Sequence, residues 1–540
     1  MLSDGFHSSC RVLLESHPVN NQYNTNKMTI QKVSLFLTKT NPRKSIHARC
    51  NPALHFNFDS APGAVQAGRH NINLTMPIKL TFHGAAGTVT GSAYHLQTSR
   101  ASVLVDFGMF QGFNHQDALN IVPPGLDLKQ LDAVLLTHAH LDHTGRLPLL
   151  AKHGYGGKIF CTEPTIPLTG LILRDSAHLQ AMDIERANRK RQRAAEVPLE
   201  PIYTAEQVEQ VLKLFKPVAY DAPVEVAPGI RARWVEAGHM LGSASLQVCI
   251  EEAGKTKTIV FSGDVGPKGV LILKDAVGFH TADVVVMEST YGDRDHKPLQ
   301  ETVDEFEAIV KKAVERKSKI LVPVFAVGRT QLLLYLLAQM FRHKVVSKFP
   351  IYLDSPMAVE ATKIYWEHLD LFDEEFQALR RERPLTADLD TVKTTPTAED
   401  SMALNDLSGP CLIMAGSGMC NGGRILHHLK QNLWREGTSV LIVGYQGDGS
   451  LGRRLVDGEK VVSIFGEKIA VKADIHTLNG FSAHAGQSEL LRWFGQLAPV
   501  RPRVFLTHGE ARGREPLAKL IQERYSLRAE LPSLGDTANL

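Results

Sequence analysis

The sequence predicts a layered α/β protein built from two parts, and three observations support that prediction. From residue 77 onward, short apolar runs that read as strands alternate with helical patterns. Histidines and aspartates repeatedly follow those strands, beside glycines. After residue 283 the pattern becomes a regular strand–helix alternation, which is typical of a largely parallel sheet covered by helices. At 540 residues the chain is also too long for one ordinary domain.

The composition excludes some classes of protein. The chain is 43% hydrophobic and 22% charged, as globular proteins usually are. Its net charge of +3 is nearly neutral, so a polyanionic partner would have to meet a local basic patch. The six cysteines form no C-x-x-C pair, which suits a reducing compartment, and no apolar run approaches the roughly 18 residues of a membrane span. We therefore expect a cytoplasmic protein that does not cross a membrane.

Residues 1–75 differ from the rest of the chain. They carry eight Lys or Arg against three acidic residues and are rich in Asn and Ser. An acid-poor leader that contains Ser is compatible with an organellar transit peptide. We favour a disordered leader or a spurious extension, with Met76 as the true start, because Asn dominates over Arg.

The first part opens with three expected strands. Ile78–Phe82 alternates like a half-buried strand, and Tyr94–Leu96 and Val103–Val105 supply two more. Asp106 follows the third strand beside a glycine turn. Such an aspartate is usually a turn former, but it can also accept a hydrogen bond from a metal-bound histidine.

A histidine-rich loop follows the apolar run Ala133–Leu136, which reads as a buried strand. The loop contains His138, His140, Asp142 and His143, and neutral imidazole and carboxylate are ligand types that suit zinc. On an extended segment the two first histidines point the same way, whereas Asp142 and His143 fall where the chain turns. One loop can therefore offer two ligand pairs to two adjacent metal ions. The alternative is a solvated, histidine-rich turn.

Further along the first part, helices are expected over residues 175–194 and 204–215. The first of these is strongly basic. A run of charge is most often a solvated helix face, and contact with nucleic acid is the alternative. His239 and Asp264 each follow an expected strand beside glycines, where layered α/β folds build metal sites.

The second part alternates strands and helices. Strands are expected at 284–287, 320–324, 351–353 and 411–414, and helices over 303–313, 330–340, from 357, and over 425–431. Residues 383–400 read as a loop or peripheral linker. A glycine-rich turn with Ser417, Gly418 and Arg424 precedes the last helix, and exposed backbone N–H groups there suit a phosphate. A tight turn without a ligand is the alternative.

The polar residues at the strand ends resemble, in order, the motifs of a known family. Four groups match the metal-site motifs of the metallo-β-lactamase superfamily, namely Asp106, the cluster from His138 to His143, His239 and Asp264. Three more resemble the additional motifs of its β-CASP branch of nucleases, namely Glu288 in Glu-Ser-Thr-Tyr-Gly, His484 in Phe-Ser-Ala-His-Ala and His508 in Thr-His-Gly-Glu. The resemblance covers the chain from Ile78 to its last residue.

The resemblance implies an α/β fold, a metallo-β-lactamase αββα sandwich with an inserted β-CASP α/β domain. Its expected divisions are the leader at 1–75, the sandwich at 76–283 and 476–540, and the insertion at 284–475. His508 favours RNA over DNA, since DNA-processing members typically lack this histidine. Pro323–Arg329 and Gly416–Met419 look closer to the polyadenylation-endonuclease-like group, of the prokaryotic type.

By this resemblance the chain is a zinc-dependent ribonuclease with two Zn²⁺ per chain. It would hydrolyse phosphodiester bonds of single-stranded RNA in RNA processing or decay, internally or from the 5′ end, in a cleft between the two domains. A homodimer is compatible with the sequence. The implied metal ligands are His138, His140 and His239 for one ion, Asp142, His143 and His508 for the other, and Asp264 as the bridge.

The resemblance also implies roles in catalysis and substrate binding. His484, oriented by Glu288, would be the general acid, and Asp106 would support a ligand histidine. Asp142 stands with this pair as a catalytic residue. The expected phosphate contacts are Ser417, Gly418 and Arg424.

Two alternatives remain open. A small-molecule metallo-hydrolase of esters, thioesters or lactams would share the metal ligands but needs neither the inserted domain nor His484. A catalytically silent RNA-binding scaffold would require broken ligands, and the sequence breaks none of them. The nuclease is therefore the favoured interpretation.

Overall fold

The computed structural model describes residues 77–112, 116–447 and 449–540. The expectations about the leader at 1–75 lie outside these residues. Among the described helices, none is long and apolar enough to cross a membrane.

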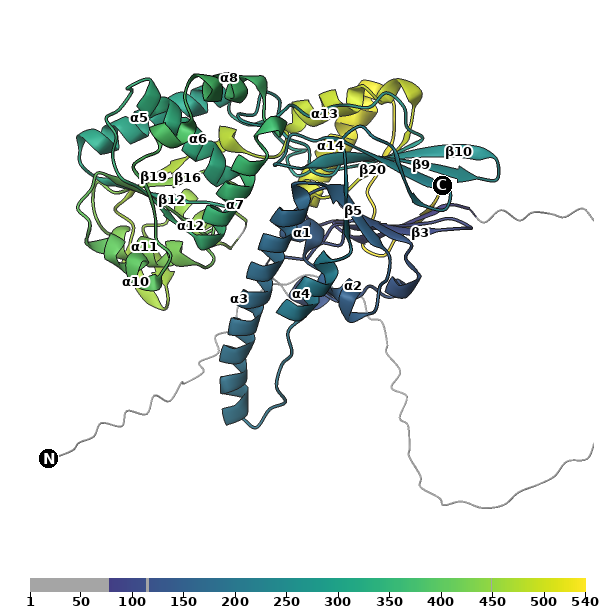
Figure 1. Cartoon of the computed structure of the whole chain (residues 1–540), viewed down its shortest axis with the longest axis horizontal. Helices are drawn as coiled ribbons and strands as arrows, with labels where there is room; N and C mark the ends of the chain where they lie inside the picture. The colour runs from purple at the N-terminus through teal and green to yellow at the C-terminus, as the bar shows by residue number, and fades with distance from the viewer. Residues whose placement is uncertain (1–76, 113–115, 448) are drawn as a thin grey trace, which may run out of the picture. The chain divides into compact units, whose positions relative to one another are not determined.

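Two seven-stranded sheets form the first part of the fold (Figure 1). The first sheet has the order β22-β1-β2-β3-β4-β5-β6, with β1 Lys79–Gly84, β2 Ala93–Gln97, β3 Ser102–Val105, β4 Ala133–Leu135, β5 Lys158–Thr162, β6 Phe215–Val218 and β22 Thr537–Asn539. The second has the order β21-β20-β11-β10-β9-β8-β7, with β7 Val224–Ala227, β8 Ile230–Glu236, β9 Ala244–Glu252, β10 Lys255–Phe261, β11 Val284–Met287, β20 Arg503–Leu506 and β21 Ala529–Glu530.

The two sheets face each other across one apolar core and carry helices on their outer faces. Leu80 and Leu96 of the first sheet and Trp234 and Phe505 of the second belong to the same buried cluster. Helices cover the first sheet with α1 Leu141–Thr144, α2 Pro148–Lys152, α3 Thr165–Arg193 and α4 Ala205–Leu212, and the second with α13 Gln487–Gly495 and α14 Ala511–Tyr525. The expected αββα sandwich is thus confirmed, and Figure 1 shows its layers.

A six-stranded sheet, parallel at every pair, forms the inserted part. Its order is β14-β13-β15-β12-β16-β19, with β12 Lys319–Pro323, β13 Ile351–Asp354, β14 Val392–Thr394, β15 Cys411–Ala415, β16 Ser439–Ile442 and β19 Asp474–Thr477. Its helices are α5 Leu299–Glu315, α6 Arg329–Arg342, α7 Pro356–Glu367, α8 Glu374–Glu382, α9 Leu385–Asp388, α10 Ala398–Ala403, α11 Arg424–Asn432 and α12 Leu451–Val456. In Figure 1, α5 and α6 lie on one side of this sheet and α11 and α12 on the other.

Smaller elements complete the described chain. The hairpin β17 Val461–Ile464 with β18 Glu467–Ala470 is a separate two-stranded sheet. Short 3₁₀ helices are η1 Gln116–Leu119, η2 Leu128–Gln130, η3 Leu369–Leu371, η4 Leu404–Asp406, η5 Asn479–Phe481 and η6 Ala498–Val500.

The expected boundary at residue 284 is wrong by one strand. β11 pairs in parallel with β10 and β20, so it belongs to the sandwich and not to the inserted sheet. At the other end β19 still pairs with β16 of the insertion. An apolar run followed by a helix shows that a strand is parallel, but not which of two sheets it joins.

Residues 383–400 are not a linker. They contain α9, the sheet's edge strand β14 and the start of α10, and the fully buried Asp388 binds the Arg342 guanidinium at 2.6 Å.

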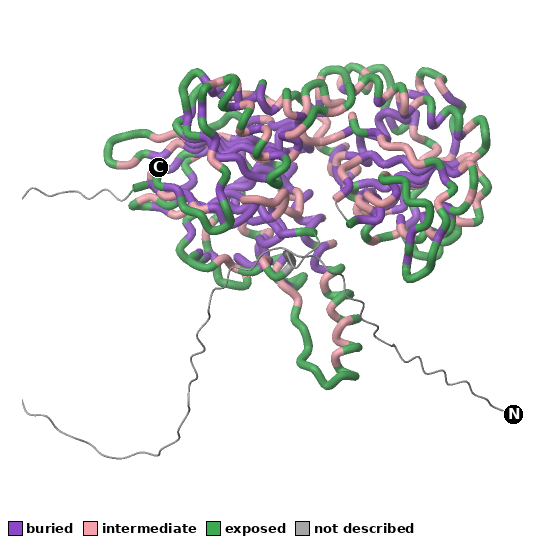
Figure 2. Tube along the Cα trace, turned by 180° about the vertical axis from the view of Figure 1, so that it is seen from behind, coloured by how far each residue is buried: buried purple, intermediate pink, exposed green. Residues whose placement is uncertain are grey.

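The helix that was expected to start at residue 175 starts at Thr165. Pro167 lies in its first turn, where the missing N–H breaks no hydrogen bond, so this proline does not interrupt the helix. Beyond Ala177 no residue of this long helix is buried, and Figure 2 shows its exposed end.

Candidate metal centre

The histidine-rich loop is anchored by Asp106, which follows β3 in a left-handed backbone conformation (φ 57°). Its carboxylate accepts hydrogen bonds from the backbone N–H of Thr137 at 2.8 Å and from the Thr137 hydroxyl at 2.9 Å. His138 and His140 follow in extended chain, and α1 then begins, so that Asp142 and His143 lie in its first turn. The turn expected after His140 is therefore one turn of helix.

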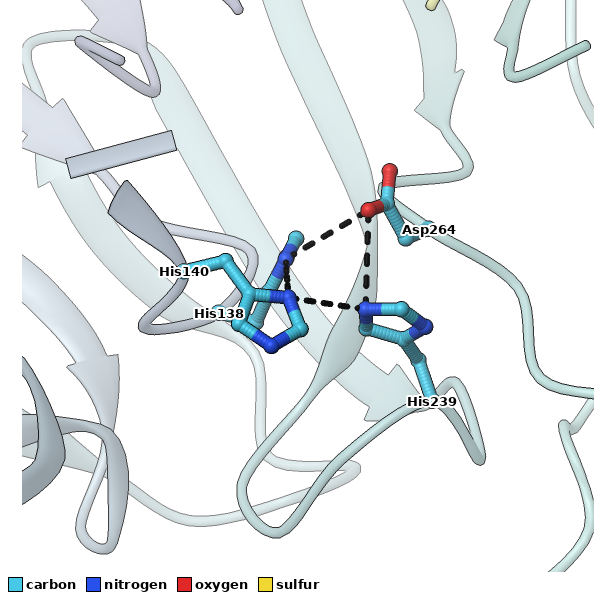
Figure 3. Close-up of side chains that lie close together, drawn as sticks. All are labelled: His138, His140, His239 and Asp264. Carbon is cyan, nitrogen blue, oxygen red and sulfur yellow. Dashed lines mark hydrogen bonds and ion pairs between the residues drawn. The ribbon is translucent and has the colours of Figure 1, made fainter. Parts of the chain in front are cut away.

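Four side chains from three separate segments meet at the first ligand group, which comprises His138, His140, His239 and one oxygen of Asp264 (Figure 3). His140 Nδ1 lies 3.2 Å from His138 Nε2 and 3.0 Å from His239 Nε2. Asp264 Oδ2 lies 3.5 Å from each of those two Nε2 atoms. The facing nitrogen and oxygen atoms form a compact set of donors suited to zinc.

The second ligand group comprises Asp142, His143 and His508. His508 Nε2 lies 3.2 Å from His143 Nε2 and 3.3 Å from Asp142 Oδ2. The loop after β20 holds His508 in place, because its backbone N–H donates to the Ala85 carbonyl at 2.7 Å. Segments separated by more than 360 positions in the sequence thus supply one group.

Asp264 lies between the two groups. Its Oδ2 faces the first group, and its Oδ1 lies 3.3 Å from His143 Nε2 and 3.6 Å from His508 Nε2. The residue is 2% exposed, and Oδ1 has no hydrogen-bond partner among the described residues. An orphaned, buried carboxylate oxygen between imidazole nitrogens is explained by cations that it would contact. The residues present therefore fit two metal ions with Asp264 as a shared ligand.

Burial and charge prepare the ligands for metal. Burial lowers the pKa of His138 and His239 well below the usual value, and that of His140 to about 4, so these imidazoles are neutral at pH 7. Burial alone would also lower the pKa of His143, but the carboxylates of Asp264 and Asp106 raise it well above its usual value. Metal binding to the second group would therefore displace a proton.

Polar partners hold the outer nitrogens of three ligand histidines. His143 Nδ1 lies 2.8 Å from Asp106 Oδ2, and His239 Nδ1 lies 2.9 Å from the Ala483 carbonyl. His508 Nδ1 lies 3.1 Å from the Thr290 hydroxyl. Such partners set which ring nitrogen faces the metal. Sequence reasoning named Asp106 and missed Thr137, Ala483 and Thr290, although all three lie inside or beside the motifs it used.

His484 and Glu288 form a pair beside the ligand groups. His484 Nδ1 lies 3.2 Å from Glu288 Oε2, and the His484 side chain is 20% exposed while Glu288 is buried. Glu288 Oε1 also accepts from the Val265 backbone N–H at 2.5 Å. Burial alone would lower the pKa of His484, but the Glu288 and Asp264 carboxylates raise it to about 9. His484 can therefore hold a proton at neutral pH.

The expected role of Arg424 needs correction. Its guanidinium donates to Asp354 Oδ1 at 2.7 Å and to the Thr395 and Pro396 carbonyls at 2.5 and 3.1 Å, and its side chain is 25% exposed. Arg424 thus closes an internal cluster and is not a free ligand for phosphate. The Ser417 hydroxyl accepts from the Asn421 and Gly422 backbone N–H groups at 3.1 and 3.2 Å. A phosphate contact by Ser417 and Gly418 stays a prediction.

Three family models match consecutive parts of this chain. The Metallo-beta-lactamase superfamily model matches residues 86–323, the Beta-Casp domain model residues 330–455, and the Zn-dependent metallo-hydrolase RNA specificity domain model residues 468–532.

Curated relatives match over most of their length. Ribonuclease TTHA0252 of Thermus thermophilus is 41% identical over 82% of this chain and 95% of its own. The transcription termination factor FttA of Cenarchaeum symbiosum is 32% identical over 86% of this chain and 71% of its own. FttA of Methanocaldococcus jannaschii is 31% identical over 80% and 67%.

Proposed function

Because the chain belongs to the β-CASP branch of the metallo-β-lactamase superfamily, we propose that it is a zinc-dependent ribonuclease that hydrolyses phosphodiester bonds of single-stranded RNA. The similarity to a ribonuclease and the match to an RNA specificity domain support RNA as the substrate. Action on cellular RNA favours the cytoplasm as its location. A homodimer remains a prediction.

One observation carries the proposal. Asp264 stands between two histidine-rich groups with a buried oxygen that no described residue satisfies. Without metal, this carboxylate oxygen has only imidazole nitrogens at 3.3 and 3.6 Å and no hydrogen bond, which is unfavourable for a buried acceptor. His138, His140 and His239 would hold one Zn²⁺, and Asp142, His143 and His508 the other, with Asp264 shared.

Two bound Zn²⁺ ions would make water acidic enough to supply the nucleophile and would offset the charge of the phosphodiester. The protein's own residues then orient the reaction. Asp106 and Thr290 keep their partner histidines in the ligating tautomer. His484 is bound to Glu288 through Nδ1, which leaves Nε2 free to give its proton to the departing oxygen. Departure of the 3′ oxygen leaves a 5′-phosphate on the other product.

The domain arrangement supports a strand held between two walls. We assign the described residues of 77–287 and 478–540 to the sandwich and the segment between them to the insertion. Glu288 directly follows β11, and His484 lies shortly after β19, so both ends of the insertion adjoin the metal centre. An RNA strand at the ligand groups would therefore meet the insertion as well.

The test uses the purified full chain, its metal content and end-labelled RNA and DNA of one sequence. We expect two zinc equivalents, cleavage of RNA with 5′-phosphate products, loss of cleavage with a chelator and recovery with zinc. Only trace metal after reconstitution with zinc would refute the metal centre. Hydrolysis of small esters without RNA cleavage would favour a small-molecule hydrolase, and full metal loading without any hydrolysis would favour a scaffold.

A further inference from the structure

A cavity of about 300 Å³ lies directly behind the loop that carries His484. Four segments line it: the loop after Asp264, the segment before α5, the start of α6 and the residues from η5 to α13. Two lining residues contact the His484 loop. The His296 Nε2–H donates to the His484 carbonyl at 2.9 Å, and the Ser482 hydroxyl accepts from the His484 backbone N–H at 3.2 Å.

Arg329 lines this cavity as a buried cation without a partner. It is the first residue of α6 and only 8% exposed, and no hydrogen bond, ion pair or ring contact of its guanidinium occurs among the described residues. Burial lowers the pKa of Arg329 to about 10, so the group stays charged at pH 7. Buried charges in folded proteins are nearly always paired, because an unpaired one is costly to desolvate. An anion from outside the chain would supply the missing partner.

The start of α6 is rigid and adds to the positive potential. Gly328 has φ 87°, a conformation that favours glycine, and its backbone N–H donates to Gln331 Oε1 at 2.7 Å. The Thr330 hydroxyl donates to the Phe325 carbonyl at 2.9 Å, and Gln331 Nε2 donates to the Ala326 carbonyl at 3.1 Å. The N-terminus of this 14-residue helix directs its positive end to the place where Arg329 stands.

The acidic residues of the cavity are already engaged. Asp295 accepts from the Ser488 backbone N–H at 2.8 Å and from its hydroxyl at 2.6 Å. Glu489 accepts from the Lys268 backbone N–H at 2.8 Å. Neither carboxylate lies within ion-pair distance of Arg329, and the Lys268 ammonium has no ion pair among the described residues either. Both carboxylates therefore have hydrogen-bond donors of their own, and Arg329 is left without a counter-charge among the described residues.

We propose that this cavity binds a phosphate group through Arg329, with Lys268 and the N-terminus of α6 in support. A phosphate there would sit beside the loop of the proton donor His484. Two sources offer the same chemistry, namely a phosphate of the RNA strand next to the cleaved bond, and free phosphate or a mononucleotide. The assignment to RNA rests on the proposed function, whereas the binding of phosphate does not.

The first arm of the test measures binding of inorganic phosphate to the zinc-loaded full chain by calorimetry and thermal unfolding. Arg329→Met removes the charge and keeps an apolar stem of similar length. We expect this variant to unfold at a higher temperature than the wild type in phosphate-free buffer, because the unpaired charge is gone. Its response to low phosphate concentrations should be lost, apart from any binding at the zinc ions, which both proteins share.

Two controls accompany this arm. Arg329→Lys keeps the charge and should retain part of the phosphate response. Arg454→Gln removes an exposed charge of the inserted domain that pairs with Glu459, and it should behave like the wild type. An Arg329→Met protein that unfolds at a lower temperature, or that responds to phosphate as the wild type does, would overturn the proposal.

The second arm identifies the source of the phosphate. If the cavity holds the RNA strand, Arg329→Met raises KM for a short RNA by about 10-fold or more, since a charge-assisted contact is lost. The salt dependence of RNA binding should then fall by about 0.7 per lost phosphate contact. If KM stays unchanged while phosphate binding is lost, the cavity serves free phosphate or a mononucleotide. If the wild type does not cleave RNA, the proposed ribonuclease activity is refuted, whereas the test of phosphate binding still applies.

Discussion

Asp264 and Asp354 are both buried aspartates at the carboxyl end of a strand, and they serve opposite purposes. Asp354 ends β13 and receives four donors, from Thr395 and Arg424 on Oδ1 at 2.6 and 2.7 Å and from Ser401 and His428 on Oδ2 at 2.6 Å each. Asp264 follows β10 and has one oxygen with no hydrogen bond among the described residues.

A structural carboxylate and a ligand carboxylate can occupy the same kind of place in the fold. A strand end beside a glycine-rich turn brings a carboxylate to the edge of a sheet in both regions. The number of hydrogen-bond donors distinguishes the two aspartates, because a carboxylate whose lone pairs all accept hydrogen bonds has none left for a cation. Arg424 belongs to the satisfied cluster, which is why it is not available to RNA.

The largest expected effect is that of Asp264→Asn. The amide cannot bridge two cations, so we expect loss of about one zinc equivalent and RNA cleavage below detection. Stability of the metal-free protein should fall, because the protonated His143 imidazole loses one of its two carboxylate partners. Elemental analysis, cleavage assays and chelated unfolding curves measure the three quantities. A variant that keeps both metal and activity would make Asp264 as structural as Asp354.

His484→Ala should lower kcat by roughly 10²–10⁴-fold with both zinc ions retained, because the leaving oxygen loses its proton donor. His280→Ala is the matched control, since His280 is exposed and lies outside the metal centre. Cleavage rates at saturating RNA and zinc content are the measurements. Equal rates for the two variants would assign the acid role to another group.

Asp106→Ala should lower cleavage by about 10–100-fold, the range typical when a partner of a ligand histidine is lost. Its carboxylate holds both His143 and the Thr137 backbone, so zinc should also bind more weakly. A zinc titration against a competing chelator checks the affinity. Unchanged affinity would mean that α1 alone positions His143.

The smallest effect on cleavage is expected for Asp354→Asn, which should instead destabilise the protein by about 3–5 kcal/mol, because Arg424 loses its buried counter-charge. The pKa of Asp354 is held well below its usual range: burial alone would raise it, but the donors from His428, Ser401, Thr395 and Arg424 outweigh burial. Its stabilising effect is thus present above about pH 4 and is lost as the pH falls further. Urea unfolding of both proteins at pH 7 and near pH 3 should show the difference shrinking with acid.

The sequence allowed the residues of the two ligand groups to be predicted together, because their signal is local. Each ligand stands within a few residues of a strand end, and His138, His140, Asp142 and His143 share one loop. The sheet that β11 joins and the acid that Arg424 meets are set by contacts across long distances in the chain. The burial of Arg329 could not be predicted either, because the cavity that it lines is formed by segments far apart in the sequence.

The distribution of the ligands along the chain also has a consequence for synthesis. His138, His140, His239 and Asp264 are all made before the insertion, whereas β20 and His508 follow it. Domains fold as they leave the ribosome, at about 5–20 residues per second. A nascent chain can therefore gather its first ligand group early, but it lacks the second group until the whole insertion has been translated.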